Sequence, residues 1–305
     1  MSSRNLVVRC YDNWGDFDEV LRYLTPGGTG IWDGVSFVRD DTVRPDWIGI
    51  FNLPRPTPLE VHHSPNRLFF AIGEPPTPFH RRLHLGQGRN TFVLTPDQRF
   101  GRRFFWPAPR RHVLGPAMLR TWSVKRGIDE RRRLRVPDKP LRLSWVTSNL
   151  SVISGHRYRL AYLERLRAAV DFDLYGRGFS PIDDKWDALA PYRYSIAFEN
   201  TSAPYYFTEK LMDCFVAETM PIYYGSKAIT QFFPAESLVV LDPEDPDVFA
   251  NIREVIQSDL YVRRKDAILE AKRLVLEKYN VFALVANFLR GVTTPPLPVR
   301  TLRIK

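Results

Sequence analysis

The segment from Tyr194 to Lys210 constrains the fold of this chain more than any other. Its apolar start, residues 194–198, predicts a short strand, and the polar residues after it predict a turn in which Pro204 prevents a helix. A helix is predicted from about Thr208, because apolar residues then recur at helical spacing. These residues are Leu211, Met212, Phe215 and Val216.

Glu209 and Lys210 therefore fall in the first turn of the predicted helix, beside unpaired backbone N–H groups and the positive end of the helix dipole. A strand that ends at the start of a helix is a natural anion site. Lys210 adds a mobile positive charge, and Glu209 adds an acceptor for hydroxyl groups. This pairing suits a nucleotide, with its phosphate near Lys210 and its ribose near Glu209.

Short apolar segments separated by longer connections predict parallel sheets with helical crossovers in both halves of the chain. The predicted strands are Asn5–Cys10, Trp47–Leu53, Leu68–Ile72, Thr91–Leu94, Leu141–Thr147, Phe172–Tyr175, Tyr194–Phe198, Ile222–Tyr224 and Val239–Leu241. The predicted helices are Arg157–Val170, Tyr261–Lys278 and Val281–Leu289, with others after Phe207, Lys227 and Asp247.

The proline-containing segment 136–140 is typical of a linker between domains. We therefore expect an N-terminal domain over residues 1–138 and a C-terminal domain over 139–290. A basic, proline-rich tail over 291–305 should be loosely held. Two α/β halves joined by a linker also favour a ligand site in the cleft between them, at the C-terminal ends of the strands.

The positive charge of the chain is concentrated in one segment. From Arg99 to Arg142 there are 14 Lys and Arg residues against 3 Asp and Glu residues, so the whole net charge of +10 arises there. A nucleic-acid patch is one interpretation, but no RNA- or DNA-binding module surrounds the segment, and we expect no nucleic-acid partner. A solvated basic face, or a surface that meets anionic lipid headgroups or an acidic glycan, remains open.

The membrane-segment, signal-peptide and cysteine patterns of the sequence indicate the cellular compartment. The sequence contains no run of 18 apolar residues, so it predicts no transmembrane helix. The apolar stretch near the first residue is too short, and polar residues follow it too soon, for a signal peptide. Cys10 and Cys214 are predicted to be buried free thiols, which indicates a reducing compartment. We expect a cytoplasmic protein, with peripheral contact between its basic segment, 99–142, and the anionic inner membrane as one of the open alternatives.

The segment around Lys210 resembles the donor-binding motif of the family 10 glycosyltransferases, the α-1,3/α-1,4-fucosyltransferases. That motif reads roughly Phe-Glu-Asn, a short variable stretch, and Tyr-x-Thr-Glu-Lys. Here it reads Phe198-Glu199-Asn200 and Tyr206-Phe207-Thr208-Glu209-Lys210. The resemblance covers about residues 141–245 well and the N-terminal third only loosely. It implies a GT-B-like fold, with two Rossmann-like doubly wound domains facing a central cleft.

The resemblance also implies roles for individual residues. Asn200, Tyr206, Glu209 and Lys210 would bind the donor, and Lys210 would stabilise the leaving diphosphate. Ser148 and Asn149 match the strand end that lines the phosphate pocket in the family. A helical arginine follows in the family pattern. Arg159 fits best, because Tyr162 and Leu166 follow it at the family spacing, and Arg157 is the alternative.

Glu74 is the predicted general base, because it ends a strand at a kinked exit and family members carry a comparable Glu there. The sequence Glu74-Pro75-Pro76 departs from the family versions, and an ordinary loop carboxylate is the alternative. Two Asp-x-Asp pairs, 16–18 and 171–173, are candidate metal ligands. The second pair fits a strand start, and the resemblance implies metal-independent enzymes, so we expect no metal.

The resemblance implies an inverting glycosyltransferase that moves fucose from GDP-fucose to a hydroxyl group of a glycan, such as a lipopolysaccharide or capsule precursor. The GDP-sugar is a co-substrate, and no further cofactor is expected. The same fold acting on another GDP-sugar is one alternative. A non-catalytic glycan- or polyanion-binding protein, which the basic segment would suit, is another.

Overall fold

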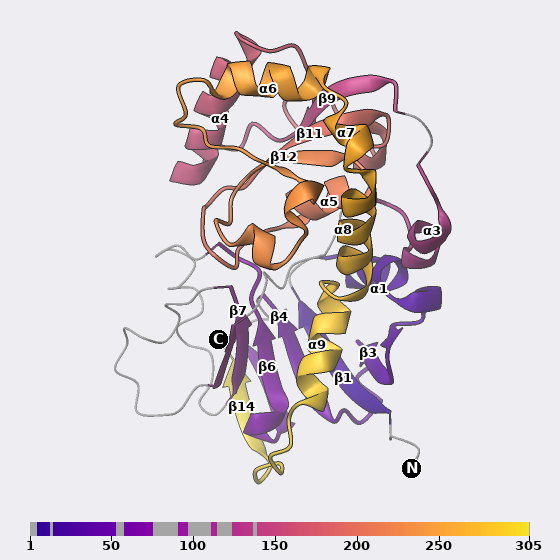
Figure 1. Ribbon diagram of the computed structural model, residues 1–305. Coiled ribbons are helices and arrows are strands. Elements are labelled where there is room, and N and C mark those ends of the chain that lie inside the picture. The colour runs from indigo at the N-terminus through magenta and orange to yellow at the C-terminus, as the bar shows by residue number, and fades with distance from the viewer. Residues whose placement is uncertain are drawn as a thin grey trace. The chain divides into compact units, whose positions relative to one another are not determined.

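A computed structural model describes residues 5–12, 15–52, 58–75, 91–96, 124–136 and 139–304, together with the backbone of 111–114. The chain forms two compact units (Figure 1). The N-terminal unit holds Met1–Arg120, Gly127–Asp129 and Tyr279–Lys305, and the C-terminal unit holds Thr121–Arg126 and Glu130–Lys278. Each unit has its own sheet and its own core.

The described part of the N-terminal unit is built on a seven-stranded sheet with the order β2-β3-β1-β4-β6-β7-β8. Neighbouring strands run parallel, except for the antiparallel pair β2 and β3. Strands occur where the sequence predicts them in β1, β4, β6 and β7. The bounds are β1 (Leu6–Asp12), β2 (Ile31–Trp32), β3 (Val35–Val38), β4 (Trp47–Phe51), β6 (Leu68–Ala71), β7 (Phe92–Thr95) and β8 (Arg111–Leu114).

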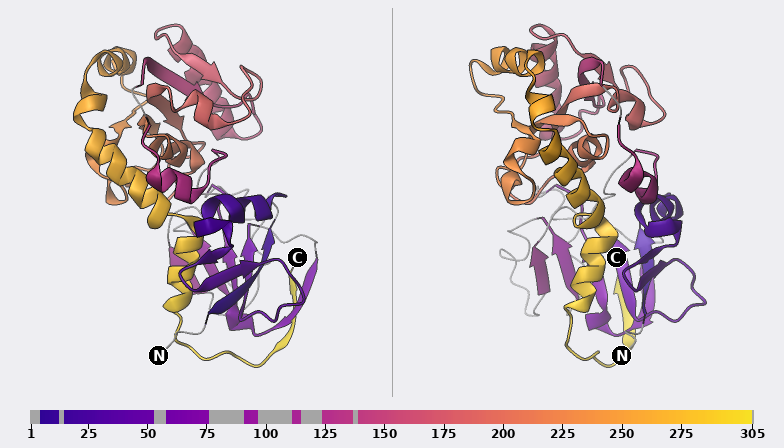
Figure 2. Two further views of the ribbon diagram at one scale, coloured as in Figure 1. Left: turned by 90° about the vertical axis from the view of Figure 1, so that its right-hand side faces the viewer. Right: turned by 45° about the vertical axis from the view of Figure 1, so that its right-hand side comes forward.

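Aromatic side chains cover one face of this sheet. Helices α1 (Phe17–Leu24) and α9 (Val281–Arg290) pack there (Figure 2). The ring of Phe282 lies 4.8 Å from that of Phe37, and the ring of Phe288 lies 5.0 Å from that of Phe92. Helix α9 is apolar on most of its surface, so it needs a buried position, and the flat sheet face provides one.

The opposite face of the sheet is covered by an antiparallel pair, β5 (Leu59–His63) and β14 (Arg300–Ile304). Leu59, Val61 and Ile304 point into a core cluster with the sheet residues Ile48 and Phe70. Short 3-10 turns occur at Pro26–Gly28 and Pro65–Arg67.

Two expectations about the C-terminal end of the chain are wrong. Residues 281–290 belong to the N-terminal unit, because their apolar side chains complete its aromatic core. The tail is not loosely held, because residues 300–304 form a strand and Asn66 accepts the backbone N–H of Leu297 at 2.8 Å.

The described part of the C-terminal unit carries a five-stranded parallel sheet with the order β10-β9-β11-β12-β13. The strands are β9 (Leu141–Val146), β10 (Asp173–Tyr175), β11 (Tyr192–Phe198), β12 (Met220–Tyr224) and β13 (Val239–Val240). The helices are α4 (Ser154–Arg167), α5 (Glu209–Val216), α6 (Val248–Gln257), α7 (Leu260–Arg263) and α8 (Lys265–Glu277). Helix α3 (Ile128–Arg133) begins in the N-terminal unit and ends in this one.

Helices cover both faces of this sheet, so the predicted doubly wound arrangement is confirmed. Helices α4 and α6 pack on the face that carries Trp145 and Ile196. Helix α5 lies on the other face, against β11 and β12, and α8 packs behind it. The helix expected after Lys227 is only a 3-10 turn, Ile229–Gln231, because Pro234 soon follows and ends it.

Two cations of the basic segment are buried, so for them the interpretation of a solvated face is wrong. Arg131 is fully buried, with its guanidinium 3.9 Å from the ring centre of Trp186. Lys139 lies in the expected linker, yet it is only 3% exposed. Its ammonium donates to four oxygens: Leu189 O at 3.3 Å, Ala190 O at 2.6 Å, Ala217 O at 2.9 Å and Thr219 Oγ1 at 3.0 Å. Residues 97–110 and 115–123 lie outside the described part.

Cys10 and Cys214 are free and buried, as predicted. Among the described residues, no helix has both the length and the apolar character needed to cross a membrane.

Asn280→Ala should lower the free energy of unfolding by about 2 kcal/mol. The Asn280 side chain caps α9 by accepting the N–H of Phe282 at 2.9 Å, and it donates to the carbonyl of Leu24 at 2.8 Å. Its removal leaves two buried backbone groups without partners. Urea unfolding measures the change. Asn287→Ala, at an exposed position of the same helix, is the control and should change stability by less than about 0.5 kcal/mol.

Candidate anion-binding site at the end of β11

The turn between β11 and α5 is organised by a buried carboxylate. Glu199 follows directly after β11 and is 0% exposed. Its Oε1 accepts the backbone N–H of Thr208 at 2.7 Å, and its Oε2 accepts the Thr208 hydroxyl at 2.8 Å. The helix begins where the sequence predicts it, with Thr208 as the N-cap of α5, so Glu199 ties the end of the strand to the start of the helix.

The Lys210 ammonium lies among oxygen atoms of this turn. Its Nζ is 3.0 Å from Glu209 Oε1, 3.2 Å from Thr208 Oγ1 and 3.8 Å from Glu199 Oε2. The side chains of Lys210 and Glu209 are 21% and 23% exposed, so both reach the surface. Lys210 is therefore a positioned cation that solvent, or a ligand, can reach.

The two carboxyl groups beside Lys210 have opposite pKa shifts. Burial raises the pKa of Glu199 to about 7, although the Lys210 ammonium acts in the other direction. Burial acts to raise the pKa of Glu209 as well, but the ammonium groups of Lys210 and Lys185 outweigh it and lower that pKa to about 2. Near neutral pH, Glu209 is ionised and Glu199 is close to its midpoint.

Arg159 joins the same cluster from α4. It is 3% exposed, its Nη1 donates to the side-chain oxygen of Asn200, and its Nη2 donates to the carbonyl of Ser148 at 3.1 Å. Its buried Nε has no hydrogen-bond partner among the described residues. Burial lowers the pKa of Arg159, and the electrostatic attraction of Glu199 and Glu209 acts in the opposite direction. One electrostatic environment therefore contains Arg159, Lys210 and both carboxyl groups.

Two glycines allow this close packing. A Cβ at Gly155, in the first turn of α4, would lie 1.7 Å from the carbonyl oxygen of Asn200. A Cβ at Gly225, after β12, would lie 2.7 Å from Glu199 Cγ. Any larger residue at either position would push α4 or β12 away from the turn.

The other predicted donor-site residues have different surroundings. Asn149 is exposed, and its backbone N–H donates to the carbonyl of Arg177 at 3.0 Å. Tyr206 is 2% exposed, so its side chain packs in the interior of the unit. Arg157, the alternative to Arg159, is exposed and donates to the carbonyls of Ser151 and Val152. The structure thus brings Ser148, Arg159, Asn200, Glu209 and Lys210 together.

Glu74 lies in the N-terminal unit, just after β6. Its Oε1 accepts the side-chain N–H of Asn52 at 3.0 Å, while the Asn52 carbonyl oxygen accepts the N–H of Gly73 at 3.0 Å. Asn52 is 4% exposed and adopts a positive φ of 66°, which asparagine tolerates better than most residues. The carboxylate is therefore held by a rigid neighbour, which the sequence did not indicate.

Sequence reasoning also missed other parts of the site. The sequence places Glu199 in a polar turn and in the motif, but it does not indicate that the carboxylate pairs with Thr208. Lys185, 28% exposed, pairs with Asp213 of α5 at 2.8 Å and adds positive charge near Glu209. The Asp pair at 171–173 does begin a strand, since Asp173 opens β10 and accepts the hydroxyl of Tyr192 at 2.7 Å.

Part of this unit is similar to a known protein family. Residues 136–268 match the family model described as glycosyltransferase family 10 (fucosyltransferase), C-terminal. A putative fucosyltransferase-like protein of Arabidopsis thaliana is 37% identical over 90 residues, which are 28% of this chain and 18% of that protein. The α-(1,3)-fucosyltransferase FucT of Helicobacter pylori is 32% identical over 90 residues, which are 29% of this chain and 18% of the enzyme. The matches thus span about a fifth of either relative.

The fold is similar over more of the chain. A solved α1,3-fucosyltransferase with GDP-fucose superposes with a TM-score of 0.51 at 15% identity, covering 91% of this chain and 93% of that one. The prediction of a GT-B-like fold is confirmed by this likeness and by the two α/β units.

Glu199→Gln should flatten the dependence of stability on pH. The ordinary pKa of a glutamate is 4.5, and burial raises the pKa of Glu199 to about 7, so between these values the folded protein holds a proton that the unfolded chain releases. The stabilisation from this proton is complete below pH 4.5 and is lost as the pH rises through 7. We expect the wild type to lose about 1–3 kcal/mol more than Glu199→Gln over this window.

Urea unfolding at several pH values tests this. Glu164→Gln, whose side chain is 70% exposed, is the control and should keep the wild-type slope. An equal slope in Glu199→Gln and in the wild type would show that Glu199 ionises normally.

Proposed function

We propose that the protein transfers fucose from GDP-fucose to a hydroxyl group of a glycan, with inversion at the anomeric carbon; the match of residues 136–268 to the model of glycosyltransferase family 10 supports this proposal. One observation carries the proposal: Arg159 and Lys210 converge on the same turn, at the C-terminal end of a parallel strand. This is where α/β folds bind nucleotides.

Arg159 and Lys210 are the proposed groups that hold the diphosphate. The Lys210 ammonium already donates to Glu209 Oε1 at 3.0 Å and to Thr208 Oγ1 at 3.2 Å. Phosphate oxygens can replace these acceptors as the ligand binds. The backbone N–H groups at the start of α5 add to the attraction. When the bond between the sugar and the diphosphate breaks, the departing oxygen takes the electron pair, and both cations stabilise the developing charge.

Glu209 and Asn200 are the proposed contacts for the rest of the donor. Glu209 is ionised at neutral pH, because its pKa is about 2, so it can accept hydrogen bonds from ribose hydroxyls. The side-chain amide oxygen of Asn200 accepts a hydrogen bond from Arg159, which orients the amide and leaves its N–H groups as donors. Ser148 contributes its carbonyl as an anchor for Arg159, and Asn149 borders the same strand end.

Glu74 is the proposed base. The acceptor hydroxyl attacks the anomeric carbon as its proton passes to the Glu74 carboxylate, and GDP leaves on the opposite side of the sugar ring. Asn52 fixes the orientation of the carboxylate through its 3.0 Å hydrogen bond. This proposal includes no metal ion, because Arg159, Lys210 and the helix start supply the positive charge that the leaving diphosphate needs.

Lys210→Met should lower kcat/KM for GDP-fucose by about 100-fold, because the variant loses the charge that stabilises the leaving diphosphate. Release of GDP in the presence of a glycan acceptor measures the rate. Lys227→Met removes an exposed lysine and should keep a rate close to that of the wild type.

The pair Arg159→Met and Arg157→Met repeats the comparison on α4, with the loss of rate expected only for Arg159→Met. Equal rates in all four variants would overturn the assignment.

Glu74→Gln should reduce transfer by at least about 100-fold while leaving GDP binding intact. The amide preserves the shape of the side chain but cannot take the proton. A thermal shift at GDP concentrations of about 100 times Kd should still report about 2.7 kcal/mol of added stability. Normal transfer by this variant would remove Glu74 from the mechanism, whereas loss of the thermal shift would mean that Glu74 acts on the donor.

A further inference from the structure

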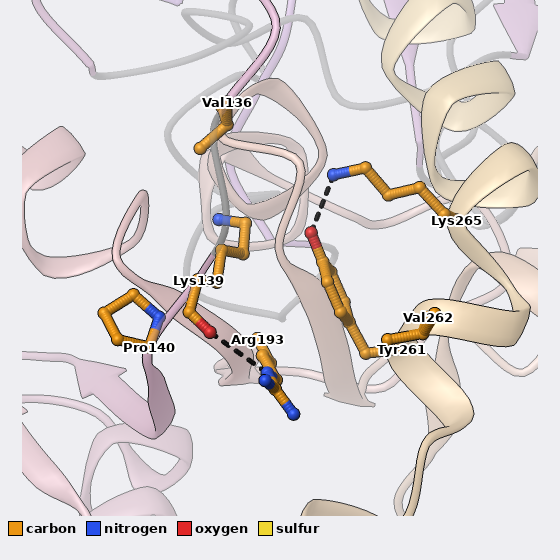
Figure 3. Close-up of a pocket in the computed structure, with 7 residues that line it drawn as sticks. All are labelled: Val136, Lys139, Pro140, Arg193, Tyr261, Val262 and Lys265. Atoms are coloured by element: carbon orange, nitrogen blue, oxygen red, sulfur yellow. Dashed lines mark hydrogen bonds between the residues drawn. The ribbon is translucent and has the colours of Figure 1, made fainter.

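A hollow in the C-terminal unit has a volume of 620 Å³ (Figure 3). We call it the cationic hollow. It is lined by Val136, Lys139, Pro140, Arg193, Tyr261, Val262 and Lys265.

The cationic hollow is separate from the proposed nucleotide site. Arg193 is the second residue of β11, whereas Glu199 follows the last residue of that strand. Six residues of extended chain span about 20 Å. The two sites therefore lie at opposite edges of the same parallel sheet, and a ligand in the hollow would not reach Lys210.

Three cationic side chains converge on the hollow from separate segments: Lys139, Arg193 and Lys265. None of the described residues that line it is acidic. Figure 3 shows the Lys265 side chain directed toward the Tyr261 hydroxyl on one side and Lys139 on the other, with Arg193 below them. The hollow therefore carries a strong positive potential.

The buried carboxylate nearby does not neutralise this charge. Glu218 is 0% exposed and pairs with Lys265 at 2.9 Å and with Lys272 at 2.8 Å. Lys139 donates only to neutral oxygens. The carboxylate of Glu218 is thus the counterion for three ammonium groups, those of Lys139, Lys265 and Lys272. A buried charge without a counterion of its own is unfavourable. An anion in the hollow would supply the missing negative charge.

Arg193 has hydrogen-bonding capacity to spare. Its Nε donates to the carbonyl of Lys139 at 3.0 Å, which fixes the plane of the guanidinium. The structure records no further bond from its terminal nitrogens to a described residue. The edge formed by its two terminal nitrogens suits a phosphate group.

The remaining wall of the hollow is apolar. Val136, Pro140 and the ring of Tyr261 line it, and Val262 is 62% exposed at its edge. An inorganic anion would leave this surface in water. A small organic molecule that bears a phosphate would cover it while its charged group meets the cations.

We propose that the cationic hollow binds the phosphate group of an organic phosphate, at a site distinct from that for the nucleotide. Arg193 and Lys265 contact the phosphate directly, and Lys139 supports it by its charge.

Calorimetric titration of the full chain with sulfate tests the site, with GDP present to occupy the nucleotide site. Arg193→Met should weaken sulfate binding by about ten-fold. Arg167→Met, which removes an arginine that is 53% exposed on α4, should bind sulfate as the wild type does. Equal binding by both variants, or no saturable binding by the wild type, would overturn the proposal.

The pH dependence of sulfate binding gives a second readout, because sulfate keeps its charge between pH 6 and pH 8. Burial and the Lys265 ammonium lower the pKa of Lys139 to about 7, while Glu218 and Cys214 act to raise it and Lys272 to lower it. A bound anion stabilises the protonated amine, so sulfate should bind more weakly at pH 8 than at pH 6. Binding that does not change with pH would remove Lys139 from the site.

A free phosphate ester and a lipid headgroup share this chemistry. Glucose 1-phosphate represents the first source, and phosphatidylcholine vesicles that contain phosphatidylglycerol represent the second. Competition with sulfate by either probe, lost in Arg193→Met, supports the site and identifies the source. Failure of both probes would contradict the proposal that the ligand carries an organic phosphate.

Discussion

The hydrogen bonds from Thr208 to the buried Glu199 carboxylate are the interaction on which the candidate site depends. They join the end of β11 to the start of α5, and they hold a carboxyl group 3.8 Å from the Lys210 ammonium. A carboxyl group that is 0% exposed is costly to ionise unless a cation is close. Glu199 and Lys210 therefore constrain each other, and Lys210 is held in place before any ligand arrives.

The parallel sheet of the C-terminal unit brings the second cation to the same place. Strands β9 and β11 are neighbours and end at the same edge, so the turns that follow them meet there. Arg159 of α4 bridges the two turns by donating to Ser148 and Asn200. Gly155 permits this approach, since its missing Cβ leaves room for the Asn200 carbonyl. The fold thus positions both cations before any ligand arrives.

Local patterns in the sequence predicted the parallel sheets and the start of α5 near Thr208, and the family resemblance implied the grouping of Arg159, Asn200, Glu209 and Lys210. What they could not predict depends on tertiary contacts. The apolar face of α9 suits either core, and only its contacts with Phe37 and Phe92 decide between them. Lys139 reads as a linker residue until four oxygens around it are seen. The sequence predicts that Glu199 lies in a polar turn, and only the tertiary structure shows that its carboxylate binds Thr208. The sequence also does not indicate that Tyr206 is buried.

A crystal structure of the protein with GDP would test the central claim most directly. The account predicts that phosphate oxygens lie within about 3 Å of the Lys210 ammonium and of the Arg159 guanidinium, with Lys210 withdrawn from at least one of its present carboxylate partners. A GDP molecule bound elsewhere, with Lys210 still on Glu209 and Thr208, would contradict it.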